Sequence, residues 1–188
     1  MLEAQTWDTE NMPSTDKLLV AAIDLGSTYS GFAFSYKHEY ENDPLKIRSN
    51  NWTSGSGGLL TLKTPTCVLF SKDKVFDSFG YEAEDKYSEL SEEEEQQEWY
   101  YFKRFRMSLF NREEPLSKAL KIKSIDGKEM VALDVFSAAI KFLKSHLLHS
   151  LEREDAGIRE ADIGWVLTVP AIWDDPARQF MREAAVRV

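Results

Sequence analysis

Residues 18–36 constrain the fold most, because two apolar segments there flank a turn made of small polar residues. The first apolar run, residues 18–23, is too short to cross a membrane and is typical of a buried strand. It ends at Asp24, and a second strand-like run begins at Phe32. We therefore predict a β-hairpin whose turn contains Gly26 and the hydroxyl residues that follow it.

The composition of this turn suits a phosphate group. Gly26 lacks a Cβ, so its backbone can adopt positive φ and let a ligand approach closely. Successive main-chain N–H groups in such a turn can bind an anion, and the hydroxyls of Ser27 and Thr28 add donors. Asp24 would repel a phosphate unless a cation lies between them, so the pattern indicates Mg²⁺ held directly or through water. The alternative is an ordinary turn, because Asp, Gly, Ser and Thr are common turn residues.

The string AIDLGSTYSG at residues 22–31 resembles the first phosphate motif of the heat-shock 70 kDa chaperone family, within the actin-like ATPase superfamily. One hydroxyl residue differs, because Ser27 stands where the family pattern has Thr. The resemblance implies that Asp24 orders Mg²⁺-bound waters. It also implies that the β- and γ-phosphates of ATP are bound by Gly26, Ser27, Thr28 and Tyr29.

Three further stretches resemble the same family. Residues 64–68, TPTCV, and residues 79–83, FGYEA, match the segment that leads into a helix. Residues 168–178 match the family's Thr-Val-Pro-Ala pattern and its downstream arginine. By resemblance, Pro170 and Arg178 form the interdomain relay that couples the nucleotide state to the substrate-binding part, although Pro170 also reads simply as the end of a strand. Together these features are most similar to the divergent member-12 branch of the family.

The chain departs from the family pattern at Glu84, where the resemblance implies a lysine that contacts the γ-phosphate and the attacking water. Such a cation typically contributes about 10²–10³ in rate. A carboxylate about 6 Å away would instead cost about 3 kcal/mol at an effective dielectric constant near 20. Lys86 would point elsewhere on a helix unless the alignment carries a gap. The substitution argues against hydrolysis, but not against nucleotide binding.

Composition limits the class of protein. The 188 residues allow one domain with a smaller lobe attached. A net charge of −9 disfavours nucleic acid and anionic membranes as the main partners. The single cysteine, Cys67, cannot form an internal disulfide. Residues 1–16 lack a secretory pattern, and no apolar run is long enough to span a bilayer, so we expect a cytoplasmic or nuclear protein without membrane insertion.

The remaining chain alternates strand and helix patterns. The predicted elements are, in order, a turn over 37–43, a loop over 50–58, strands over 59–63, 65–70 and 75–79, a helix over 88–110, a hairpin at Asp126 and Gly127, a helix from Asp134, a strand over 163–169 and a helix from Asp175.

These patterns predict an α/β fold. Together with the resemblance, they imply the first lobe of an actin-like ATPase, with a ribonuclease-H-like core over residues 17–188 and a β-rich sub-lobe inserted at about 38–130. Residues 1–16 are expected to be a disordered tail. The second lobe and the substrate-binding domain of that family have no counterpart in this sequence.

The function hypothesis is an ATP/Mg²⁺-binding lobe of an atypical, heat-shock 70 kDa-type chaperone-related protein of the stress response. The family is an ATPase family, but this chain alone is expected to be inactive, because its nucleotides lie between two lobes. Nucleotide and unidentified protein partners or clients are the expected ligands. Two alternatives remain: a non-hydrolysing adaptor or scaffold, and a truncated isoform that binds no ligand by itself.

Overall fold

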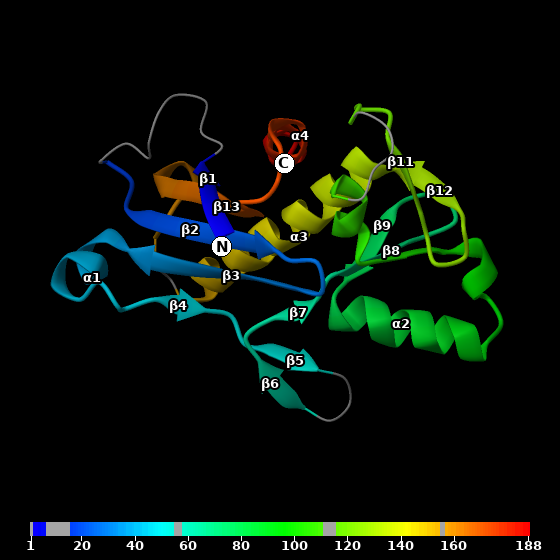
Figure 1. The fold of residues 1–188 in the computed structure, drawn as a ribbon. Coiled ribbons are helices and arrows are strands. Elements are labelled where there is room, and N and C mark those ends of the chain that lie inside the picture. Colours follow the sequence, from blue (N-terminus) through cyan, green and yellow to red (C-terminus); the bar gives the residue numbers. More distant parts are fainter. Residues whose placement is uncertain (1, 7–15, 55–57, 111–115, 155–156) are drawn as a thin grey trace.

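The main sheet is mixed and contains six strands in a computed structural model that describes residues 2–6, 16–54, 58–110, 116–154 and 157–188. Its strand order is β1-β13-β2-β3-β4, and β7 also pairs with β3 (Figure 1). The strands are β1 (Leu2–Thr6), β2 (Leu19–Leu25), β3 (Tyr29–Tyr36), β4 (Arg48–Ser49), β7 (Thr64–Pro65) and β13 (Ile163–Pro170). Only β13 and β2 run parallel within this sheet of the described chain. The chain is therefore a mixed α/β protein, as predicted.

The predicted hairpin is formed by β2 and β3, which pair antiparallel from Leu19–Tyr36 to Leu25–Ser30. Side chains of β2 alternate, because successive residues of a strand point to opposite faces. Leu19, Ala21, Ile23 and Leu25 are fully buried. In contrast, Val20 on the opposite face is 42% exposed.

Two helices cover the buried side of this sheet. α3 (Ala132–Arg153) contacts β2 and β3, and α4 (Asp175–Val186) packs against α3. The apolar residues that recur along α3 at helical spacing form one buried stripe: Phe136, Ala139, Ile140, Leu143, Leu147 and Leu151. α3 starts before the predicted cap at Asp134. α4 is capped by Asp174, whose carboxylate accepts a hydrogen bond from the N–H of Ala177 at 3.0 Å, one residue before the predicted cap.

A second group of elements lies beside the main sheet (Figure 1). It contains a three-stranded sheet of β10 (Tyr100–Lys103), β8 (Cys67–Phe70) and β9 (Phe76–Phe79), together with α2 (Tyr81–Glu92). The ring of Phe142 on α3 lies 5.1 Å from that of Phe79 on β9, centroid to centroid. α3 therefore packs against both groups.

Two smaller hairpins complete the fold. β11 (Lys121–Lys123) and β12 (Glu129–Val131) pair around the predicted turn, where Gly127 has φ of 81°. β5 (Trp52–Ser54) and β6 (Leu59–Thr61) form the other, so the predicted loop over 50–58 was wrong in part. Residues 55–57 lie outside the described chain.

The predicted helix over 88–110 is wrong. α2 ends at Glu92, and short 3₁₀ turns at Gln96–Glu98 and Phe105–Leu109 flank β10. Tyr101 and Phe102 of β10 are buried where the strand pairs with β8, so tertiary burial outweighs the local preference for a helix. A further 3₁₀ turn covers Glu160–Asp162 before β13.

The N-terminal segment also differs from the predicted tail. Leu2–Thr6 pair antiparallel with β13 as the edge strand β1. The edge of β13 that faces away from β2 has main-chain donors and acceptors, and β1 satisfies them by pairing with it. Residues 7–15 of the predicted tail lie outside the described chain.

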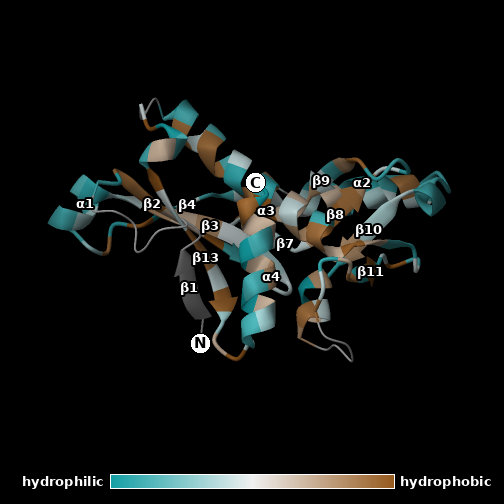
Figure 2. Ribbon diagram, turned by 90° about the horizontal axis from the view of Figure 1, so that it is seen from above, coloured by the Kyte–Doolittle hydropathy of each residue, from teal (hydrophilic) through white to brown (hydrophobic). Residues whose placement is uncertain are grey.

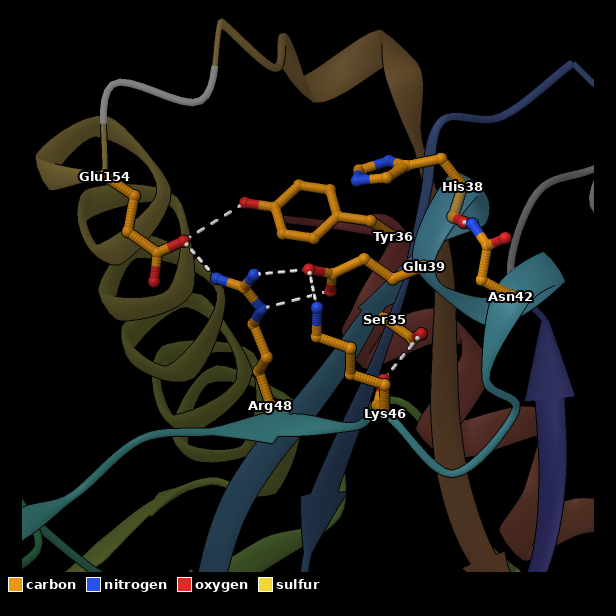
Figure 3. Close-up of polar contacts among 8 residues, drawn as sticks. All are labelled: Ser35, Tyr36, His38, Glu39, Asn42, Lys46, Arg48 and Glu154. Atoms are coloured by element: carbon orange, nitrogen blue, oxygen red, sulfur yellow. Dashed lines mark hydrogen bonds and ion pairs between the residues drawn. The ribbon is translucent and has the colours of Figure 1, made fainter.

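A polar cluster explains why residues 37–43, predicted as a turn, form the helix α1 (Lys37–Asn42). Glu39 of α1 is 8% exposed and accepts hydrogen bonds from Arg48 at 2.6 Å, with Lys46 at 2.8 Å. Arg48 also contacts Glu154, next to the end of α3, at 3.1 Å, and Tyr36 donates to the same carboxylate (Figure 3). The cluster ties α1 to β4 and α3.

Hydropathy follows this arrangement, since α1 is hydrophilic along its length and β2 is mostly hydrophobic (Figure 2). Among the residues described, no helix combines the length and apolar character needed to cross a bilayer.

The Glu39 cluster makes folding stability depend on pH. Hydrogen bonds from Arg48 and then Lys46 lower the pKa of Glu39 from 4.5 to about 2. The stabilising contribution of ionised Glu39 is therefore complete above pH 4.5 and is lost as the pH falls from 4.5 to 2. We expect Glu39→Gln to be less stable than the wild type at pH 6 and to approach it at acid pH, measured by urea unfolding across this range. A constant difference at every pH would contradict this assignment.

Candidate functional site

Asp24 lies at the end of β2, next to the turn formed by Gly26, Ser27 and Thr28. In the parallel register of β13 and β2 it faces Thr168, whose hydroxyl donates to Asp24 Oδ1 at 2.8 Å. The other oxygen, Oδ2, lies 2.6 Å from Lys63 Nζ. Both carboxylate oxygens are therefore held in place by groups from distant parts of the chain.

Gly26 is required for a steric reason. A Cβ at this position would lie 2.1 Å from the carbonyl oxygen of Tyr29, closer than any side chain tolerates. The φ angle of Gly26 is not in the positive region, contrary to what its place in a tight turn suggested. The turn therefore closes so tightly on the backbone of Tyr29 that only a hydrogen fits.

The loop offers main-chain donors. Within the part of the chain that the structure describes, no protein acceptor bonds the N–H groups of Ser27 and Thr28. One carbonyl group of the loop already has a donor, because the carbonyl of Thr28 accepts a hydrogen bond from the N–H of Thr66 at 2.8 Å. The buried hydroxyls of Ser30 and Thr66 bond each other at 2.6 Å. The predicted residues Asp24 and Gly26–Tyr29 thus lie together at one end of β2, with open N–H groups.

Arg106 supplies a buried positive charge behind the loop. Its Nη1 donates to the carbonyl of Leu25, and its guanidinium lies 4.7 Å from the ring centre of Trp173. Nε and Nη2 have no hydrogen-bond partner among the described residues. Burial lowers the pKa of Arg106, and the negative charge of Asp24 opposes this effect. The charge of Arg106 therefore acts on the same carboxylate as Lys63.

A cavity of about 460 Å³ opens beside the loop. Its walls include Thr28, Tyr29, Thr66, Glu84, Lys103 and Arg104. Glu84 lies 3.0 Å from Lys103, so its negative charge is partly offset and its repulsion of a phosphate is weaker than the sequence alone suggests. Lys86 instead contacts Asp77 at 2.5 Å and does not line this cavity.

The thiol and the carboxylates near the loop decide which covalent or metal chemistry the site could support. Burial raises the pKa of Cys67, in the cavity wall, to about 11, so its thiol stays protonated at neutral pH. Across the described segments, no group of three or more His, Cys, Asp and Glu side chains could hold a metal ion. A cation at Asp24 would therefore have one carboxylate from this chain and water as its remaining ligands, an arrangement that Mg²⁺ tolerates well.

Pro170 and Arg178 lie at the two sides of the turn after β13. The N–H of Trp173 donates to the carbonyl of Pro170 at 3.1 Å, and Arg178 Nη2 donates to the carbonyl of Ala171 at 2.9 Å. Thr168, which bonds Asp24, is two residues before Pro170 on the same strand. The predicted relay residues are therefore connected to Asp24 through β13.

Sequence reasoning did not assign a role to Lys63, Thr168 or Arg106. Thr168 could have been found, because it belongs to the quoted motif and lies on the predicted strand over 163–169. Lys63 and Arg106 carry no local signal, since each reaches the site from an element whose pairing is set by the tertiary fold.

Comparison with known proteins supports the resemblance. Human heat shock 70 kDa protein 12B is 43% identical over 169 residues, which are 89% of this chain and 24% of that protein. The mouse heat shock 70 kDa protein 12A is 39% identical over the same shares, and human 12A is 37% identical over 181 residues, 95% of this chain and 26% of that protein. The chain thus spans about a quarter of the length of these relatives. No protein-family model matches it. The predicted relationship to the member-12 proteins is confirmed.

The tight turn at Gly26 can be tested directly. Gly26→Ala must push the Tyr29 carbonyl away, so we expect a loss of about 2 kcal/mol in the free energy of unfolding. Ser27→Ala is the matched control, because its side chain leaves the turn backbone unchanged. Urea unfolding of both variants gives the comparison, and equal stability of the two would refute the steric requirement.

Proposed function

We propose that this relative of heat shock 70 kDa proteins 12A and 12B binds ATP with Mg²⁺ at the β2–β3 loop. It would do so as the first, ribonuclease-H-like lobe of an actin-like nucleotide-binding domain in an atypical chaperone-related protein. The observation that carries the proposal is the position of Asp24, fixed by Thr168 next to a glycine loop with open N–H groups.

The loop can accept phosphate oxygens through several donors. The N–H groups of Ser27 and Thr28 lack protein acceptors in the described chain, and adjacent main-chain donors of this kind form anion sites. The side chain of Tyr29 is 50% exposed, so its hydroxyl is available to a ligand. The buried charge of Arg106 would stabilise negative charge on the loop from behind.

Asp24 would hold the metal. When bound, Mg²⁺ neutralises charge between this carboxylate and the phosphates, which would otherwise repel each other. The carboxylate of Asp24 offers the oxygen atoms that Mg²⁺ prefers, and its Oδ2 already pairs with the positive charge of Lys63. Both features suit a divalent cation held through water.

Glu84 disfavours the hydrolysis step that an efficient ATPase performs. Its carboxylate lines the cavity beside Thr28 and Tyr29, where positive charge would be needed for phosphoryl transfer. Lys103 offsets that charge but is held by it at 3.0 Å. Binding without turnover follows, and this favours the second candidate, a non-hydrolysing adaptor that nucleotide binding regulates.

The relay residues would transmit nucleotide binding to another part of such an adaptor. The path runs from Asp24 through Thr168 and along β13 to the turn at Pro170, where Arg178 holds the carbonyl of Ala171. Ile172, in the same turn, is 75% exposed. A change at Asp24 on nucleotide binding would therefore reach a surface where another domain or a protein partner could dock.

Nucleotide binding is tested by titrating MgATP into the chain and following backbone amide shifts by NMR. We expect the amides of Ser27 and Thr28 to shift, with a dissociation constant moved toward millimolar because one loop supplies only part of the donors that a triphosphate can use. Asp24→Asn keeps the shape of the side chain and removes its charge, so it should weaken MgATP binding about tenfold. Asp73→Asn, in an exposed turn, is the control. If the loop amides of the wild type do not shift on addition of MgATP, the proposal is wrong.

Hydrolysis is tested separately by single-turnover release of phosphate from radiolabelled ATP. We expect no release above the buffer blank, because Glu84 brings no net positive charge to the cavity. Release by the wild type that disappears in Asp24→Ala would show that the site turns ATP over and would contradict the adaptor interpretation.

A further inference from the structure

Lys63 is an exposed cation that contacts Asp24 of the proposed site. Its Nζ lies 2.6 Å from Asp24 Oδ2, while Thr168 occupies Oδ1. Its side chain is 52% exposed, so the ammonium group stays in contact with solvent while it pairs with Asp24.

The fold builds a path for this side chain across β3. Lys63 lies between β6 and β7, and Gly31 of β3 is the direct neighbour of Asp24 in the antiparallel register. A Cβ at Gly31 would lie 3.1 Å from the carbonyl oxygen of Leu62 and 3.5 Å from Lys63 Cγ. The missing side chain at Gly31 therefore lets the backbone of Leu62, next to Lys63, lie close against β3, and the lysine stem passes this strand at van der Waals distance.

Lys63 also starts next to the loop that would hold the phosphates. The residues that follow it, Thr64 and Pro65, pair with Ser30 and Tyr29. The chain at Lys63 is thus fixed to the strand that leaves the loop, and a four-carbon stem lets its ammonium group reach either Asp24 or an anion on the loop.

Two other cations near the loop already have partners. Arg106 is buried, bonded to the carbonyl of Leu25 and stacked on Trp173, so it cannot follow a ligand. Lys103 is paired with Glu84. Lys63 combines proximity to Asp24, exposure and a flexible stem.

We propose that Lys63 is the phosphate-contacting lysine of this site and that it exchanges its partner when magnesium arrives. This inference rests on the proposed function. Two cations cannot share Asp24 Oδ2 without repulsion, so Mg²⁺ at this carboxylate displaces the ammonium group. The displaced group then bonds the phosphate oxygens on the adjacent loop. Positive charge comes to the site from the strand region before β7, whereas Glu84 of α2 supplies none.

The exchange predicts opposite effects on two ligands. Lys63→Met keeps most of the stem and removes the charge, so MgATP should bind about tenfold more weakly, as expected for the loss of a hydrogen bond to a charged group. Mg²⁺ alone should bind more tightly, because nothing competes for Asp24. Lys63→Arg, which keeps the charge, should retain most of the affinity for MgATP.

Both ligands are titrated into the whole chain, with dissociation constants obtained from amide shifts of the loop. Lys121→Met is the matched control, because Lys121 is an exposed, paired lysine on the separate β11–β12 hairpin. Thermal unfolding of each variant verifies that it is folded. Wild-type-like MgATP affinity in Lys63→Met, or weaker binding of Mg²⁺ alone, overturns the exchange while leaving the proposed function intact. Absence of MgATP binding by the wild type overturns both.

Discussion

The parallel pairing of β13 with β2 is the constraint on which the site and most of the fold depend. It places Thr168 beside Asp24 across 144 positions of sequence. A parallel pair requires a crossover connection between its two strands. The chain between β2 and β13 includes α3, which packs against the sheet. The same pairing puts the turn at Pro170 at the Asp24 end of the sheet. Without this register the carboxylate would lose its orienting hydroxyl, and the turn at Pro170 would lose its connection to the loop.

The parts that the sequence predicts well are those with strong local patterns. The β2–β3 hairpin follows from two apolar runs around a glycine turn, and the apolar stripe of α3 follows from helical spacing. The hairpin at Gly127 follows from a dipeptide with a known turn preference. Asp24 and the loop residues could be proposed as a site for the same reason, because all of them lie within one short segment.

The parts that it predicts poorly depend on distant partners. Residues 100–103 lie inside a stretch predicted as a helix, yet they form β10 because Tyr101 and Phe102 are buried where this strand pairs with β8. α1 forms where Glu39 meets Arg48, and neither residue indicates the other in sequence. Lys63 belongs to the same class, since its proximity to Asp24 exists only after β7 has paired with β3. A single motif therefore shows that Glu84 stands where the resemblance implies a lysine, but it cannot show that Lys63 lies beside Asp24.

The shared helix α3 has a mechanical consequence. Its buried stripe packs under the main sheet, and Phe142 on the same helix contacts Phe79 of the three-stranded sheet and Trp52 of the β5–β6 hairpin. If α3 detached, all of these elements would lose their apolar support at once, so they should melt as one cooperative unit. Relative movement of the two groups would then have to be elastic bending about a continuous core.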